Sequence, residues 1–300
     1  MVTPLADRDT LDVEGLHRLV EHILAGGVGG LFVLGTTGEG PSLSYHLRRE
    51  LVEWVCGIVA GRVPVLVGVT DTAFIESINV AEEAAEAGAD AVVLAAPYYF
   101  APGQEDLCHY IRAISAEMPL PVFLYNMPGQ TKVTFSIDLV RRVMELPNVV
   151  GVKDSSGDMI YFDQLRQVVA DREDFSLLIG PEELLAEAVL LGAHGGVNGG
   201  ANIWPELYVA LYNAAAASDL ERANKLHRKV VQLASSVYRV GPPGAPVLQG
   251  IKTALSILGI CSDLPAEPFR RLNEEQRAVI EEAVSSLGLL DEAPLSTDMG

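Results

Sequence analysis

Residues 147–157 read Pro-Asn-Val-Val-Gly-Val-Lys-Asp-Ser-Ser-Gly, and they contain the pattern that decides the fold. The run Val149–Val152 has the length and the β-branched content of a buried strand. Lys153 follows this run directly and is one of only five lysines in 300 residues. Because a buried charge is costly, a lysine in this place is either paired with an acid or held as a neutral amine. A neutral lysine in a pocket can attack a carbonyl carbon and form a Schiff base.

A simpler alternative is open for Lys153. Its ammonium could pair with the carboxylate of the neighbouring Asp154 and only help to close a loop. Taken by itself, Lys153 fits this alternative better than it fits catalysis. The polar residues that follow the other predicted strands therefore decide between the two interpretations.

Short apolar runs like Val149–Val152 recur along the chain and alternate with segments of helical periodicity. They start roughly 20 to 33 residues apart, the length of one strand, one helix and two short loops. Strands that are apolar throughout are typical of parallel sheets covered on both faces. The pattern predicts an α/β fold, a (β/α)8 TIM barrel, rather than a doubly wound sheet with a glycine fingerprint after its first strand. The predicted strands are 30–35, 63–68, 91–96, 121–125, 149–153, 176–180 and 195–199.

The eighth strand needed to close the barrel has one candidate, Met1–Pro4, which is too short for a whole strand. Either the chain begins a few residues late, or the first strand is a stub and the barrel has a weak seam. After residue 216 the alternation stops, and helices are predicted at 218–240, 248–258 and 274–287. We therefore predict a barrel domain (1–216), a helical C-terminal appendage (217–290) and a frayed tail (291–300).

Composition excludes several classes of function. The net charge of −19 argues against nucleic acid and anionic membranes as partners, since both need clustered cations. No apolar run has the length of a membrane span, and the N-terminus does not resemble a signal peptide. The three cysteines are far apart and read as reduced thiols of a cytoplasmic protein. Because no histidines and cysteines cluster at ligand spacing, we expect no dedicated metal site.

Polar residues follow most of the predicted strands, at the ends that meet in the mouth of a barrel. Each has a simple structural explanation when taken alone, such as a turn or a packing contact. Together they supply a nucleophile, a phenolic acid or base, hydroxyl relays and a small-anion pocket. Lys252, on a predicted C-terminal helix, is a weaker second candidate for amine chemistry. The residues at the strand ends are Thr36, Thr37, Glu39, Tyr98, Tyr99, Tyr125, Asn126, Lys153, Asp154, Ser155, Ser156 and Asn198.

Four of these segments appear in order and carry a resemblance that covers essentially the whole chain. The chain resembles the dihydrodipicolinate synthase / N-acetylneuraminate lyase family of Schiff-base lyases. This resemblance implies a small 2-oxo acid substrate, no cofactor, and a homotetramer built from tight dimers. The segments are Gly35-Thr-Thr-Gly-Glu39, Pro97-Tyr-Tyr99, Tyr125-Asn-Met-Pro-Gly129 and Gly151-Val-Lys-Asp-Ser-Ser-Gly157.

The resemblance also implies roles for individual residues. Lys153 would condense with the keto carbon of pyruvate or a related 2-oxo acid, and Tyr125 would shuttle protons over the imine. Thr36 would relay protons to Tyr125 and, with Thr37, hold the substrate carboxylate. Tyr99 would complete the relay from across a dimer interface. Val197 matches the position whose backbone carbonyl lies near the active lysine.

One departure from the family pattern concerns the second substrate. In dihydrodipicolinate synthases an arginine grips that substrate's carboxylate, whereas the matching position here is Gln130. A neutral amide cannot offer the charged, bidentate contact of a guanidinium. We therefore predict a lyase that cleaves, condenses or dehydrates a 2-keto-3-deoxy sugar acid or similar 2-oxo acid. The alternative is dihydrodipicolinate synthase itself, and a metal-dependent barrel lyase or a non-catalytic barrel are more distant alternatives.

Overall fold

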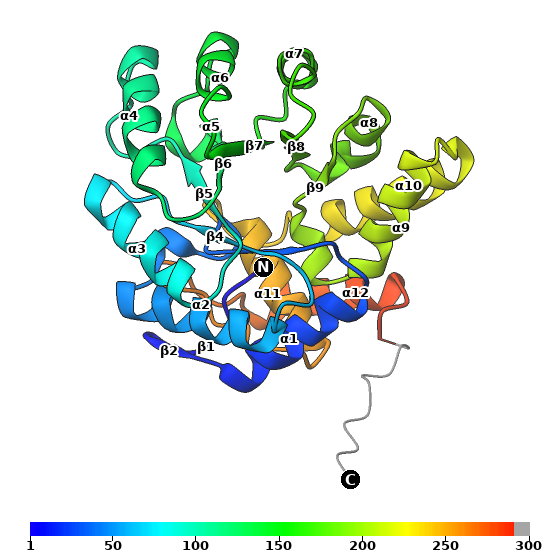
Figure 1. Cartoon of the computed structure of the whole chain (residues 1–300). Helices are drawn as coiled ribbons and strands as arrows, with labels where there is room; N and C mark the ends of the chain where they lie inside the picture. The colour runs from blue at the N-terminus through cyan, green and yellow to red at the C-terminus, as the bar shows by residue number, and fades with distance from the viewer. Residues whose placement is uncertain (291–300) are drawn as a thin grey trace.

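A parallel sheet forms the inner layer of the molecule (Figure 1). The computed structural model describes residues 1–290, so the tail predicted for 291–300 lies outside the described residues. The sheet has seven strands in the order β3-β4-β5-β6-β7-β8-β9, which confirms all seven runs predicted from apolar patterning. The strands are β3 (Leu31–Val33), β4 (Val65–Gly68), β5 (Ala91–Ala95), β6 (Val122–Asn126), β7 (Val149–Asp154), β8 (Ser176–Ile179) and β9 (Gly195–Gly196).

Helices follow each strand and cover the outer face of this curved sheet, which confirms the barrel class of fold (Figure 1). The strands are apolar throughout because the helices cover one face while side chains of other strands fill the interior. The helices of this layer are α1 (Val13–Ala25), α2 (Tyr45–Val59), α3 (Phe74–Glu86), α4 (Gln104–Glu117), α5 (Pro128–Thr131), α6 (Ile137–Val143), α7 (Met159–Val169), α8 (Leu185–Leu190) and α9 (Pro205–Ala216), with 3-10 turns η1 (Gly40–Ser42), η2 (Glu182–Leu184) and η3 (Gly199–Asn202).

The two ends of the sheet, β3 and β9, are joined by the first residues of the chain instead of by a strand ladder. Met1–Pro4 is not a strand, but its residues are fixed at both ends of the sheet. The Val2 amide donates to Asn202 Oδ1 at 2.9 Å, and the Thr3 hydroxyl donates to the Gly38 carbonyl at 2.7 Å. Among residues 1–290, no strand ladder therefore joins β9 to β3, an outcome that both predicted alternatives for Met1–Pro4 allow.

A small antiparallel pair of strands near the N-terminus was not predicted. The strands β1 (Leu5–Asp7) and β2 (Thr10–Leu11) form their own sheet, outside the barrel ladder. They are too short and too polar for an apolar run to reveal them, because only Leu5 and Leu11 are buried. The periodicity used for the other strands carries no signal for a pair of this kind.

The predicted C-terminal helices are present. They are α10 (Leu220–Val237), α11 (Pro246–Ile257) and α12 (Glu274–Ser286). Asp219 caps α10 by accepting a hydrogen bond from the Arg222 amide, and Asn273 and Gln276 form a capping box on α12. α11 packs against both α12 and η3, so it lies against the loop that follows β9. No helix among residues 1–290 is long and apolar enough to cross a membrane.

The hydrophobic core has two parts. The larger part lies between the sheet and the helices, where each fully buried valine or leucine side chain contributes about 1.5–3 kcal/mol. The smaller part fills the barrel interior and includes Val93, Ala95 and Tyr125, packed against Phe32, Leu66 and Phe123. Side chains from four neighbouring strands therefore close the interior, and the residues that follow them point into the mouth.

Candidate active site

Lys153 lies at the carboxyl end of β7, inside the barrel, beside Tyr125 of β6. The register of the two strands pairs these residues directly. Lys153 Nζ lies 4.2 Å from the centre of the Tyr125 ring and 5.0 Å from that of the Phe32 ring. The side chain is 7% exposed. The buried ion pairs of residues 1–290 join Arg48 to Asp71 and Lys252 to Glu39, so Lys153 belongs to neither.

Asp154 does not pair with Lys153, so the simpler alternative for this lysine is wrong. Successive side chains of a strand point to opposite faces, and Asp154 therefore lies outside the barrel. Its Oδ1 accepts a hydrogen bond from Asn126 Nδ2 at 2.7 Å, and its Oδ2 accepts one from the Ser156 hydroxyl at 2.9 Å. Burial raises the pKa of the Asp154 carboxyl even though these hydrogen bonds act in the opposite direction.

The hydroxyl of Tyr125 lies 3.3 Å from the Thr36 hydroxyl, where either group can be the donor. Burial by itself raises the pKa of the Tyr125 phenol. The neighbouring Lys153 ammonium and hydrogen bonds with Thr36, Ser155 and Lys153 outweigh that effect, and the pKa lies below its ordinary value. The phenol is therefore easier to ionise than that of a free tyrosine, as an acid–base group requires.

The loop Gly35–Gly40 carries Thr36 and Thr37 over the end of β3, and close backbone packing fixes its position. Leu34 has a left-handed backbone with φ of 58°, which turns the chain into this loop. A Cβ on Gly40 would lie 2.3 Å from the Leu34 carbonyl oxygen, and one on Gly68 would lie 2.5 Å from it. Only glycine permits this approach from both sides, so the position of Thr36 depends on both glycines.

The remaining predicted residues are dispersed over the mouth. Val197 extends β9, and its amide donates to the Ile179 carbonyl at 2.9 Å. Gln130 is exposed on the short helix α5. Tyr99 is 89% exposed and has a left-handed backbone with φ of 82°, which is strained for an aromatic residue. Within residues 1–290, its hydroxyl forms no hydrogen bond with Tyr125 or any other group.

Two further carboxylates near the mouth are buried: Glu39, which is among the predicted strand-end residues, and Glu182, which was not predicted. Glu182, directly after β8, accepts hydrogen bonds from the hydroxyls of Tyr208 and Tyr238 and, at 2.9 Å, from the Gly200 amide. Burial raises the pKa of the Glu182 carboxyl. The other is Glu39, which pairs with Lys252; this pairing, with Lys252 fully buried, contradicts the prediction of Lys252 as a second amine nucleophile. The one sequence signal for Glu182 is its place two residues after the predicted strand 176–180.

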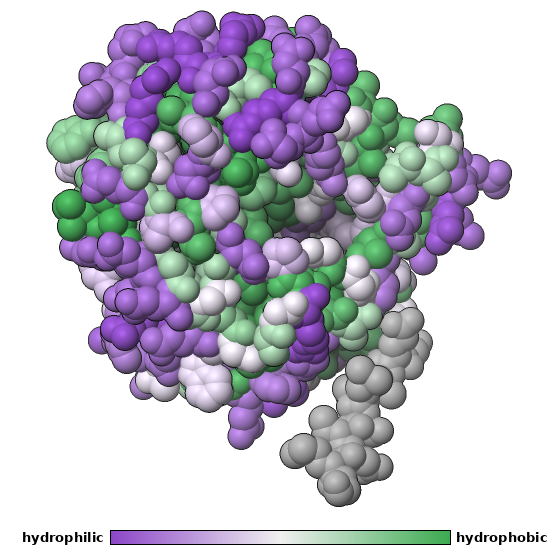
Figure 2. Space-filling model, in the orientation of Figure 1, coloured by the Kyte–Doolittle hydropathy of each residue, from purple (hydrophilic) through white to green (hydrophobic). Residues whose placement is uncertain are grey.

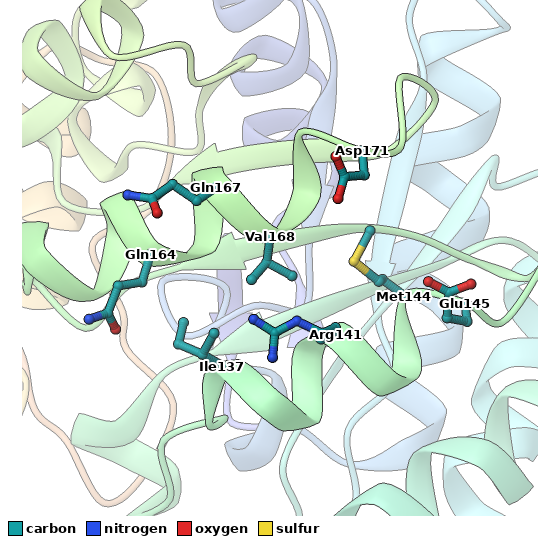
Figure 3. Close-up of a pocket in the computed structure, with 8 residues that line it drawn as sticks. All are labelled: Ile137, Arg141, Met144, Glu145, Gln164, Gln167, Val168 and Asp171. Carbon is teal, nitrogen blue, oxygen red and sulfur yellow. The ribbon is translucent and has the colours of Figure 1, made fainter.

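A pocket outside the barrel does not coincide with these residues. It has a volume of about 510 Å³ and lies between α6 and α7, on the outer helical layer (Figure 3). Its lining is strongly charged, because it includes the side chains of Arg141, Glu145 and Asp171.

In the space-filling view, apolar and weakly polar residues surround a central hollow, and the outer helices carry most of the polar surface (Figure 2). Within residues 1–290, no group of three or more His, Cys, Asp or Glu side chains could hold a metal ion.

Comparison with known proteins agrees with this geometry. The chain matches the model of the Dihydrodipicolinate synthetase family over residues 1–287. It is 35% identical to the 4-hydroxy-tetrahydrodipicolinate synthase of Phenylobacterium zucineum, over 97% of this chain and 96% of the relative. The structure of dihydrodipicolinate synthase from Bacteroides thetaiotaomicron superposes with a TM-score of 0.93 at 54% identity, covering 95% of this chain and 96% of the other. YagE, a prophage protein of the dihydrodipicolinic acid synthase family from E. coli K12 solved with pyruvate, has a TM-score of 0.90 at 28% identity, covering 96% of each chain.

These matches identify the class of protein and its family. The chain is a lyase of the class I aldolase type, folded as a barrel with a C-terminal helical region. It belongs to the dihydrodipicolinate synthetase family, because the family model spans nearly its whole length. The resemblance seen in the four strand-end segments is thereby confirmed.

Proposed function

We propose that Lys153 forms a Schiff base with pyruvate. The resulting enamine forms a carbon–carbon bond with an aldehyde, or is released by cleavage of such a bond in the reverse direction. The observation that carries this proposal is the Lys153 amine, buried against the Tyr125 ring and free of any ion pair within residues 1–290. The relatives' names support it, since they include synthases of this family and a structure solved with pyruvate.

The proposed chemistry begins when the neutral Lys153 amine attacks the C2 carbonyl carbon of pyruvate. Loss of water from the carbinolamine leaves an iminium, which withdraws electrons and makes the C3 protons acidic. Loss of a C3 proton gives an enamine, whose C3 attacks the carbonyl carbon of an aldehyde. The resulting alkoxide takes up a proton, and water hydrolyses the new iminium, which releases the product and the free Lys153 amine. In the cleavage direction the same steps run backward.

Tyr125 is proposed as the group that delivers and removes protons during these steps. Its hydroxyl is hydrogen-bonded to Thr36, and its pKa lies below that of an ordinary phenol. Proton transfer through a positioned side chain is efficient when its pKa approaches the working pH. Thr36 would pass the proton on, and with Thr37 it would donate hydrogen bonds to the substrate carboxylate. Val197 is proposed to line the same cavity through its backbone.

The names of the relatives favour aspartate semialdehyde as the second substrate, which makes 4-hydroxy-tetrahydrodipicolinate synthase the leading candidate. They support this alternative better than the sugar-acid reaction predicted from the sequence. Gln130 favours the sugar-acid reaction as a second candidate, because the exposed amide on α5 provides no positive charge for a second carboxylate. The nearby Lys132 is engaged elsewhere, since its Nζ donates to the Gly129 carbonyl at 2.8 Å.

A substrate panel separates these two candidates. Purified protein is incubated with pyruvate alone, with pyruvate plus aspartate semialdehyde, with pyruvate plus glyceraldehyde, and with a 2-keto-3-deoxy sugar acid alone. Borohydride reduction followed by mass spectrometry reports the captured keto acid. Turnover with aspartate semialdehyde supports the synthase, and pyruvate release from the sugar acid supports the second candidate. If no keto acid is trapped, the Schiff-base proposal is wrong.

Replacement of Gln130 by arginine is expected to raise kcat/KM for aspartate semialdehyde. A charged hydrogen bond to a carboxylate contributes about 1.5–3 kcal/mol, which corresponds to roughly 10- to 100-fold. The pyruvate trapping rate should not change, because Gln130 lies on α5, beyond the end of β6. Gln130→Leu is the matched control, and it should not show the gain. A Gln130→Arg variant without increased kcat/KM would exclude this position as the carboxylate contact.

We also propose that the chain assembles as a homotetramer of tight dimers in which Tyr99 serves the neighbouring active site. Its high exposure and strained backbone support a role outside its own chain, and Phe100 beside it is 80% exposed. Lys153→Ala and Tyr99→Phe chains should each be impaired. Mixed after subunit exchange, they should regain activity, because one site of each mixed dimer has both groups. An unchanged rate after mixing would contradict the shared site.

A further inference from the structure

We infer that Lys252 and Glu39 are positioning residues that hold the Gly35–Gly40 loop in place. They thereby keep Thr36 and Thr37 in the position that their proposed roles require. This inference rests on the proposed function, since it assigns the pair to the carboxylate-binding and proton-relay part of that site. Lys252 belongs to α11 of the C-terminal region, whereas Glu39 follows β3 of the barrel. The pair therefore connects the C-terminal helices to the active-site loop.

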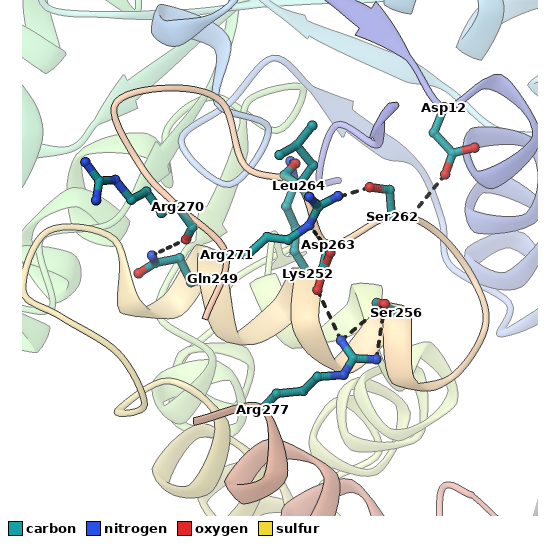
Figure 4. A network of polar contacts seen from close by, with 10 residues as sticks. All are labelled: Asp12, Gln249, Lys252, Ser256, Ser262, Asp263, Leu264, Arg270, Arg271 and Arg277. Atoms are coloured by element: carbon teal, nitrogen blue, oxygen red, sulfur yellow. Dashed lines mark hydrogen bonds and ion pairs between the residues drawn. The ribbon is translucent and has the colours of Figure 1, made fainter. Parts of the chain in front are cut away.

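Glu39 and Lys252 form a fully buried ion pair with further hydrogen bonds on each side. Lys252 is 0% exposed, and its ammonium contacts Glu39 Oε2 and donates to the Leu264 carbonyl at 2.7 Å. Glu39 Oε1 accepts a hydrogen bond from the Ala266 amide at 2.6 Å. Figure 4 shows Lys252 on α11 beneath the segment that carries Leu264. The carboxylate of Glu39 thus docks on both α11 and the segment after it.

The backbone of Glu39 transmits this position to Thr36. Glu39 has a left-handed backbone with φ of 58°, a strained conformation for glutamate that its buried side chain holds in place. Its amide donates to the Thr36 carbonyl at 3.1 Å. The Thr36 hydroxyl in turn lies 3.3 Å from the Tyr125 hydroxyl. One residue therefore carries both the tie to α11 and the hydrogen bond that fixes Thr36.

The energetics favour a geometric purpose for the pair. A buried ion pair is often no more stabilising than apolar residues of similar volume, because both charges lose their hydration. A pair that only stabilised the fold could be replaced by a methionine and a neutral side chain at little cost. What such a replacement cannot supply is the directed attachment of Glu39 to α11. Loss of that attachment changes the separation of Thr36 and Tyr125, which a proton relay tolerates poorly.

The test compares single and double variants in the full chain. Glu39→Gln leaves the buried Lys252 ammonium without its carboxylate and should lower the melting temperature. The double variant Glu39→Gln with Lys252→Met removes both charges and should recover most of that loss. Glu39→Asp keeps both charges but shortens the connection by one methylene group. For each protein, the rate of pyruvate trapping by borohydride, the pyruvate KM, kcat and the melting temperature are measured.

The wild-type protein is measured first, because failure to trap pyruvate would overturn the proposed function and not this inference. We expect the double variant and Glu39→Asp to trap pyruvate roughly 10- to 100-fold more slowly and to have a raised pyruvate KM, while the double variant keeps a near-native melting temperature. The matched control is Gln249→Leu on the same helix, which loses a 2.7 Å hydrogen bond to the Arg270 carbonyl (Figure 4). It should lose stability but trap pyruvate normally.

Two results would overturn the inference. One is a folded double variant or Glu39→Asp variant that traps pyruvate at the wild-type rate with an unchanged KM. The other is a Gln249→Leu protein that is slowed as much as the Glu39 variants, because general loosening of α11 would then explain the effect. Glu39→Asp retains the ion pair, so it keeps the test decisive if the double variant does not fold.

Discussion

Lys153→Arg is expected to lower kcat by roughly 10³-fold or more and to abolish the borohydride-trapped pyruvate adduct. Arginine keeps the positive charge and much of the length of the side chain, but its guanidinium stays protonated and cannot act as an amine nucleophile. Packing on the Tyr125 and Phe32 rings, which lie 4.2 and 5.0 Å from Lys153 Nζ, should persist. The loss therefore reports nucleophilic chemistry rather than the loss of a charge.

Lys132→Arg is the matched control for this experiment. Lys132 is an exposed lysine whose Nζ donates to the Gly129 carbonyl of its own turn. It should leave the adduct and kcat unchanged. A trapped adduct that persists in Lys153→Arg, or that maps by peptide mass to another lysine, would show that the nucleophile has been wrongly assigned.

Tyr125→Phe is expected to lower kcat by roughly 10²- to 10⁴-fold, the range for loss of a general acid–base group. Phenylalanine keeps the ring that contacts Lys153 and loses only the hydroxyl that lies 3.3 Å from Thr36. The adduct should still form, more slowly, because Lys153 remains. Tyr161→Phe is a suitable control, since that buried hydroxyl donates to the Phe135 carbonyl and is no part of the proposed site.

The pH profile gives Tyr125 a second, independent signature. Because the pKa of its phenol is lowered, its proton is lost at a lower pH than that of an ordinary tyrosine. In the wild type, the alkaline limb of log kcat/KM, which reports groups of the free enzyme, should therefore begin below the usual phenol range of about 10. That limb should be absent from Tyr125→Phe and unchanged in Tyr161→Phe. An identical limb in all three proteins would assign it to another group.

The strands, and the position of Lys153 at the end of one of them, could be predicted from the sequence because both leave local signals. All seven apolar runs became strands, and Lys153 stands at the end of one of them. Strand alternation also explains why Asp154 lies on the other face from Lys153. Motifs at several strand ends provided the family, which the match over residues 1–287 confirms.

Features that depend on distant segments could not be predicted. Glu39 and Lys252 are far apart in sequence, and nothing local indicates that one lies against the other. The seam near Val2 depends on an Asn202 side chain from the opposite end of the sheet. The short strands β1 and β2 have too few buried positions to show a period. Contacts between distant segments, rather than local propensity, decide the first two, and the shortness of β1 and β2 hides the third.

The hydrogen bond between Asn126 and Asp154, 2.7 Å long behind the sheet, has a consequence for how substrate preference can change. It locks together the two strand ends that carry Tyr125 and Lys153 on their other side. The proposed reacting pair is thus preorganised by rigid elements, whereas Gln130 lies on a four-residue helix beyond them. An engineer could redesign that helix for new aldehydes while leaving the imine-forming geometry untouched.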